Sequence, residues 1–95
     1  MFILKPRESF QVLIAEIMEE YKITSDRTAR RKTGVTLLVL KHWRDGKQLP
    51  SMKSLFAFSA GLAKTTKNSP QDVIDTVFES MQEWRDINRA CALRE

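Results

Sequence analysis

The stretch TGVTLLVLKHWRDGKQLP, residues 33–50, decides the fold of this 95-residue chain. Thr36 is a suitable helix N-cap, four aliphatic residues follow it in a row, and Gly46 is suited to end the helix. A short surface helix buries one side only, so such a run places an aliphatic residue on the outside. That residue needs a contact other than the hydrophobic core on which its helix packs.

Helical geometry divides these residues between two sides. At about 100° per residue, Leu40 and Trp43 share one side, which we expect to face the core. Leu38 lies almost opposite, beside Lys41 and His42. We call Leu38, Lys41 and His42 the outward face of this helix.

Four other helices are predicted around this one. They span 8–22, the segment capped by Thr24 or Ser25 and ended by Gly34, a segment capped by Ser51, and 70 to about 90 behind the N-cap Ser69. The stretch AKTTKNSP (63–70) is expected to be a polar connector. The sequence therefore predicts an all-α protein of five short helices. Residues 1–69 would form the main unit, and residues 70–95 a C-terminal helix packed on it within one structural domain.

Positive charge is concentrated in the middle of the chain. Residues 22–53 carry nine basic and two acidic side chains, a net charge of +7, whereas the whole chain carries +4. A local positive field of this kind favours a polyanionic partner. By itself the charge is more typical of a solvated basic face.

Composition argues against several other classes of protein. Cys91 is the single cysteine, which excludes an internal disulfide and indicates a reducing compartment. No apolar run reaches the roughly 18 residues of a membrane span. His42 is the single histidine and lacks acidic or cysteine partners at ligand or catalytic spacing. We therefore expect a cytoplasmic protein that is not an enzyme, with no catalytic residue, metal site, cofactor or small-molecule ligand.

The spacing of residues from 34 to 62 resembles a known family. Gly34-Val35-Thr36, then Leu40, Trp43, Gly46 and Pro50-Ser51, followed by SLFAFSAGL, is similar to the lambda-repressor-like (XRE-type) helix-turn-helix domain. Trp43-Arg44 is similar to phage Cro-like regulators. In that family an alanine of the second helix enters the core, and a one-residue insertion before Gly34 would give this place to Ala29 rather than Arg30.

The resemblance implies a DNA-binding function. The family inserts its recognition helix into the major groove of double-stranded DNA. Thymine methyl groups would be contacted by Leu37 and Leu38, guanine or phosphate by Lys41 or His42, and phosphates by other polar residues. The residues implied for DNA contact are Ser25, Arg27, Thr36, Leu37, Leu38, Lys41, His42, Arg44 and Lys47. Asp45 lies among them and would repel phosphate.

The fifth predicted helix carries more apolar surface than one packing side requires. We expect it to pack inward and also against a second copy of the chain, forming a homodimer that spans a palindromic operator. The residues predicted at this interface are Ile74, Val77, Phe78, Met81 and Trp84. The alternative is that the helix caps the domain core only. The N-terminal arm, which begins MFILK, is a candidate to exchange across such a dimer.

The function predicted from these features is a transcriptional regulator that resembles Cro-like repressors of phages or other mobile elements and associates with the nucleoid. A second reading stays open. Leu37 and Leu38 beside His42 could form an apolar patch for a protein partner, on a helix-turn-helix scaffold that does not read DNA.

Overall fold

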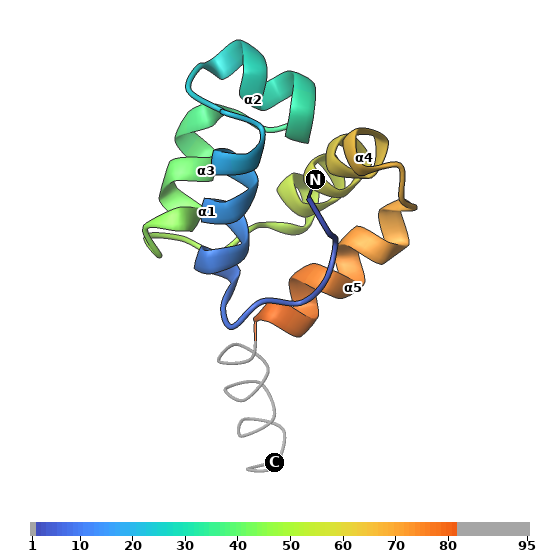
Figure 1. The fold of residues 1–95 in the computed structure, drawn as a ribbon. Coiled ribbons are helices and arrows are strands. Elements are labelled where there is room, and N and C mark those ends of the chain that lie inside the picture. The colour runs from blue at the N-terminus through green and yellow to red at the C-terminus, as the bar shows by residue number, and fades with distance from the viewer. Residues whose placement is uncertain (1, 82–95) are drawn as a thin grey trace.

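The computed structural model describes residues 2–81, and this part of the chain consists of helices joined by short loops, without strands (Figure 1). The predicted all-α class is confirmed. The five helices are α1 (Phe10–Glu20), α2 (Asp26–Thr33), α3 (Leu37–Arg44), α4 (Met52–Thr66) and α5 (Pro70–Ser80).

A serine or threonine caps the start of every one of these helices. In each case its side-chain oxygen accepts the backbone N–H three residues further on, which satisfies a donor that the helix itself leaves unpaired. The caps are Ser9, Ser25, Thr36, Ser51 and Ser69. The last four are confirmed sequence predictions, and Asp72 completes a capping box at the start of α5.

The C-terminal ends of two helices differ from the prediction. The segment 63–70 is not a connector along its whole length, because α4 continues to Thr66 and ends on Lys67 in the left-handed conformation. Its threonines fit a helix because their hydroxyls donate to helix carbonyls four residues back. The fifth helix ends at Ser80 rather than near residue 90, with Met81 as its C-cap. The rest of the predicted helix, including Trp84 and Cys91, lies outside the described residues.

The core forms around Trp43. Its ring centroid lies 5.4 Å from those of Phe10 on α1 and Phe58 on α4, in tilted and edge-on contacts. Leu40, one turn before Trp43, is fully buried, so the predicted inward side of α3 is confirmed. Ala29 is also fully buried, which confirms the prediction that this alanine of α2 enters the core. Val73 and Val77 of α5 belong to this same core.

The turn from α2 to α3 lies directly against α4. Gly34 has φ +78°, the left-handed conformation predicted for this residue, and it ends α2. Gly61 of α4 touches the backbone at Thr33, since a Cβ at position 61 would lie 2.4 Å from the Thr33 carbonyl carbon. Thr65 strengthens this contact by donating to the Lys32 carbonyl at 2.7 Å. Helix α4 thus fixes the end of α2 and leaves the beginnings of α2 and α3 at the surface.

Candidate nucleic-acid interface

The first turns of α2 and α3 are joined by a hydrogen bond. The N–H of Leu37, the first residue of α3, donates to Oδ1 of Asp26, the first residue of α2, at 3.0 Å. The predicted phosphate-contacting residues Ser25 and Arg27 flank Asp26 and are exposed. The structure therefore brings two separate sets of predicted site residues, those at 25–27 and those at 36–38, to one place on the surface.

The outward face of α3 is accessible as predicted. Leu38 is 62% exposed, whereas Leu40, two residues later, is 0% exposed. Lys41 is exposed beside Leu38, and His42 is half-buried. Leu37 is also half-buried, because its side chain packs against the core. Leu38 and Lys41 therefore provide most of the accessible surface of this part of α3.

The end of α3 adds two exposed bases close to the outward face. The Lys47 N–H donates to the His42 carbonyl at 2.9 Å, so the turn after α3 folds back and carries Lys47 toward His42. The Arg44 Nε donates to the Asp45 carboxylate at 3.3 Å. Asp45 thus neutralises part of the charge of Arg44 and weakens the positive field at this end of the helix.

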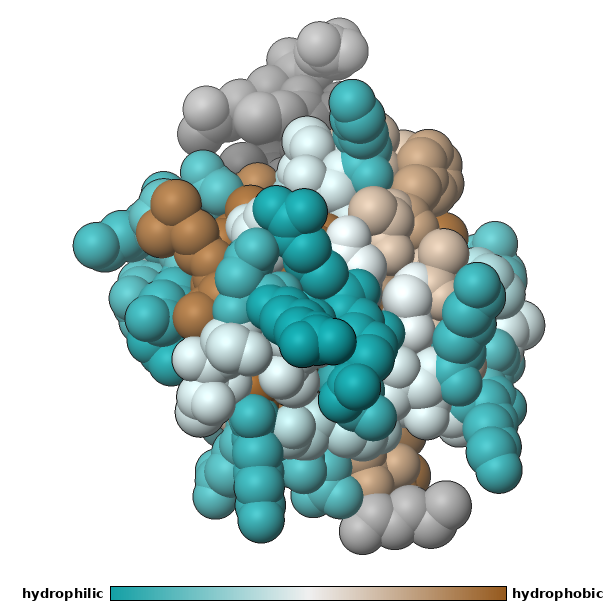
Figure 2. Space-filling view, turned by 90° about the horizontal axis from the view of Figure 1, so that it is seen from above, coloured by the Kyte–Doolittle hydropathy of each residue, from teal (hydrophilic) through white to brown (hydrophobic). Residues whose placement is uncertain are grey.

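Basic side chains of α2 extend the positive surface. Arg27, Arg30 and Arg31 are exposed, and Lys32 is half-buried with Nζ 5.7 Å from the centre of the Tyr21 ring. Figure 2 views the molecule from the α2 end, where hydrophilic side chains gather at the centre. An apolar area adjoins them at the left, the side on which α3 lies in Figure 1. The candidate interface therefore combines cations with an apolar margin.

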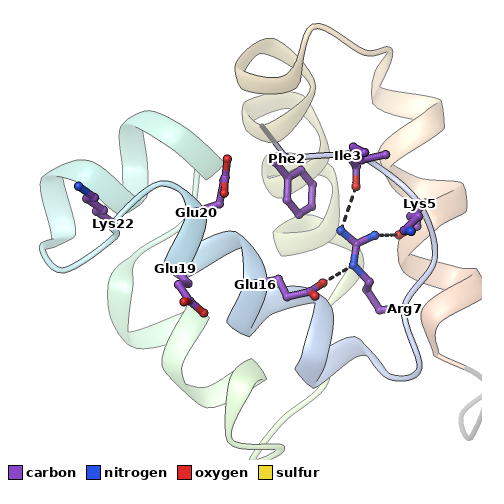
Figure 3. Close-up of a pocket in the computed structure, with 8 residues that line it drawn as sticks. All are labelled: Phe2, Ile3, Lys5, Arg7, Glu16, Glu19, Glu20 and Lys22. Carbon is purple, nitrogen blue, oxygen red and sulfur yellow. Dashed lines mark hydrogen bonds and ion pairs between the residues drawn. The ribbon is translucent and has the colours of Figure 1, made fainter.

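A groove beneath the N-terminal arm differs in character from this basic surface. It is lined by Phe2, Ile3, Lys5, Arg7, Glu16, Glu19, Glu20 and Lys22 (Figure 3). Arg7 lies over the Phe2 ring, donates to the carbonyls of Ile3 and Lys5, and pairs with Glu16 of α1. Its three acidic side chains are balanced by three basic ones, so the groove lacks the excess of positive charge that distinguishes the surface of α2 and α3.

The arm itself lies on its own chain. The Arg7 N–H donates to Ser80 Oγ at 2.9 Å, which attaches the arm to the end of α5 (Figure 1). The Phe2 ring packs 6.1 Å from the Tyr21 ring at the end of α1. Burial raises the pKa of the Tyr21 phenol, and the neighbouring Glu20 carboxylate raises it further. An exchange of the arm between two chains stays a prediction.

The residues predicted at the dimer interface do not share one environment. Val77 and Met81 are buried in the core of their own chain, so they act in folding and offer no surface to a partner. Ile74 and Phe78 are half-buried on the flank of α5. Trp84 lies outside the described residues. Any contact made by α5 with a second copy therefore depends on this flank.

Sequence reasoning missed two features of the surface. One is Asp26, whose role depends on a partner eleven residues further along the chain. The other is a group of exposed apolar side chains near the start of α4. These residues are Leu49, Met52 and Phe56.

Comparisons of the chain with protein-family profiles, curated proteins and solved structures find no match. Within residues 2–81 no helix is long and apolar enough to cross a membrane. In the same range, no three histidine, cysteine, aspartate or glutamate side chains converge in a way that could hold a metal ion.

Proposed function

We propose that the protein is a sequence-specific transcriptional regulator that binds double-stranded DNA through the major groove, in the manner of a Cro-like repressor. The observation that carries this proposal is the accessible outward face of α3 beside the cations of α2. An exposed leucine next to bases, on a short helix whose other side is buried, suits apolar readout of a base edge.

Each exposed residue has a role in this proposal. The Leu38 side chain contacts a thymine methyl group, and Lys41 donates to guanine acceptors or to phosphate. Arg27, Arg44 and Lys47 contact phosphates, which supply much of the affinity and fix the orientation of the protein. Ser25, Thr36, Leu37 and His42 lie at the margin of this surface and contribute less area.

The regulator acts as a homodimer on a palindromic operator. Two copies whose α3 helices lie about 34 Å apart would meet successive major grooves on one side of the duplex. The half-buried flank of α5 at Ile74 and Phe78 is the surface that we assign to this contact. The protein works in the cytoplasm at the nucleoid, requires no cofactor, and regulates through its own concentration.

Selection of bound duplexes from a random pool, at two salt concentrations, tests this proposal. We expect enrichment of an inverted repeat of two half-sites at both concentrations, with weaker binding at the higher salt because phosphate contacts release counterions. A pool that stays random at both concentrations would contradict sequence-specific DNA binding.

The exposed residues Leu49, Met52 and Phe56 favour a second candidate function. Three large apolar side chains on one part of the surface are typical of a contact with another protein. Under this alternative the chain is a protein-interaction module, and Phe56→Ala would abolish a protein complex without changing DNA binding.

A further inference from the structure

One carboxylate connects the two helices of the candidate interface. Asp26 Oδ1 accepts the Leu37 N–H at 3.0 Å, and Oδ2 pairs with Arg30 Nε at 2.9 Å. Both oxygens are therefore engaged. The first bond joins α2 to α3, and the second holds the carboxylate in place from within α2.

This bond is separate from the N-cap bond of each helix. Ser25 already caps α2, and Thr36 caps α3 by accepting the Val39 N–H at 3.3 Å. The bond from Asp26 to Leu37 instead fixes the exposed beginning of α3 relative to α2. Because Leu37 directly precedes Leu38, a rotation of this turn would move the outward face.

We propose that Asp26 is a positioning residue for DNA recognition, which fixes the start of α3 so that Leu38 meets a base edge in one geometry. This inference rests on the proposed function. Base readout requires side chains held to within about 0.5 Å, whereas contacts with phosphate tolerate more movement. Loss of the bond should therefore reduce the preference for one sequence more than it reduces affinity for DNA.

The loss of negative charge in an Asp26 variant needs a separate control. Its side chain is 54% exposed, and removing a negative charge from this basic surface would by itself tighten binding to any duplex. Asp45 provides the match, because it is the other acid between residues 22 and 53 and bonds to its neighbour Arg44 rather than across helices. Asp45→Asn removes a charge of the same sign without touching the bond between α2 and α3.

The experiment measures the dissociation constants of the full chain for its selected site and for a random duplex. The ratio compared below is the constant for the random duplex divided by the constant for the selected site, so a lower ratio means weaker discrimination. Asp45→Asn and Asp26→Asn should each bind the random duplex roughly threefold tighter at low salt, with the ratio of the two constants unchanged. Asparagine keeps the ratio because its side-chain oxygen still accepts from Leu37. Asp26→Ala should lower the ratio about tenfold, the discrimination that a single base-reading side chain supplies.

A second test removes the donor of this bond, the Leu37 N–H, instead of the acceptor. Proline fits the first position of a helix but has no N–H, so Leu37→Pro deletes the bond and keeps the charge of Asp26. Leu37→Ala is its control, since it removes the same leucine side chain and retains the N–H. We expect Leu37→Pro to have a ratio several-fold lower than Leu37→Ala.

The outcomes separate this inference from the proposed function. A wild-type chain that selects a site, together with Asp26→Ala and Leu37→Pro variants that discriminate as well as their controls, would overturn the inference alone. A wild-type chain that prefers no duplex would overturn the proposed function and this inference with it.

Discussion

Leu38 and Leu40 are identical residues two positions apart on one helix, and the structure gives them opposite surroundings. The first is exposed and the second is enclosed by the core. Burial of a leucine stabilises a protein by about 1.5–3 kcal/mol, so the exposed leucine contributes little to folding. Its contribution is therefore expected in binding.

Truncation of these two leucines should separate stability from recognition. Leu38→Ala should leave the thermal unfolding temperature nearly unchanged and should weaken binding to a thymine-containing site by about 1 kcal/mol. Leu40→Ala, the control, should lower the free energy of unfolding by about 2–5 kcal/mol because it leaves a cavity. Calorimetry and fluorescence anisotropy measure the two effects. A Leu38→Ala variant that unfolds as readily as Leu40→Ala would contradict the surface assigned to Leu38.

The cations of α3 should act on DNA of any sequence. Lys41→Ala should weaken binding to specific and random duplexes alike, and should reduce the salt slope by about one unit for each phosphate that the lysine neutralises. Arg44→Ala should have a smaller effect because Asp45 already neutralises part of this charge. Titrations at several salt concentrations measure both slopes. Weaker binding confined to one sequence would assign Lys41 to base readout instead.

At the scale of helices, the contact between α2 and α4 depends on Gly61, which does not have a positive φ. Alanine normally stabilises a helix relative to glycine by about 1 kcal/mol. At Gly61, however, the added methyl would meet the backbone of Thr33 and Gly34. We expect Gly61→Ala to destabilise the protein by about 1–2 kcal/mol because α2 has to move.

The neighbouring position supplies the control for that substitution. Ala60 is exposed, so Ala60→Gly should cost about 1 kcal/mol through helix propensity alone. Gly61→Ala raises helix propensity and Ala60→Gly lowers it, yet both should lower the midpoint of denaturant unfolding. A rise in the midpoint for Gly61→Ala would show that α2 and α4 do not approach as closely as the structure indicates.

Docking of the N-terminal arm should be visible in the titration of Tyr21, the only tyrosine of the chain. Its raised pKa means that the folded state keeps the proton above pH 10.0, the ordinary value. The associated stability is complete below that pH and is lost as the pH rises through the folded pKa. Phe2→Ala uncovers the ring and should move its pKa back toward the ordinary value.

Phenolate absorbance follows this titration directly. Ile3→Ala is the control, because Ile3 is on the same arm and is exposed. It should leave the pKa of Tyr21 where it is in the wild type. An equal pKa in Phe2→Ala and the wild type would contradict the contact between the arm and α1.

The helices could be predicted from the sequence to the extent that their signals are local. Caps such as Thr36 and Ser69 act within three residues, and the sides of α3 follow from helical period. The full length of α4 was missed because threonine is a weak helix former whose hydroxyl bonds appear only in the folded chain. Contacts such as Asp26 to Leu37, or Gly61 to Thr33, join separate elements and leave no local pattern.

For the whole molecule, the predicted dimer now has a narrower basis than the sequence suggested. Val77 and Met81 serve the core, so the flank of α5 at Ile74 and Phe78 has to supply the described part of the interface. In the full chain, Ile74→Glu should weaken self-association at least tenfold, because a carboxylate would lose its water at the contact. It should also weaken operator binding.

Sedimentation over a range of concentrations measures this change. Gln71→Glu, an exposed position at the start of the same helix, adds the same charge and should leave the assembly unchanged. Equal sedimentation of the wild type and Ile74→Glu would remove this flank of α5 from any interface between copies.

The claim on which this account depends is that the outward face of α3 lies against the duplex. Backbone amide signals recorded by NMR during titration with the selected duplex test it most directly. We predict the largest changes at residues 25–27 and 36–42, and small changes at the arm and at Met52 and Phe56. Changes centred on Met52 and Phe56, or the absence of change along α3, would contradict it.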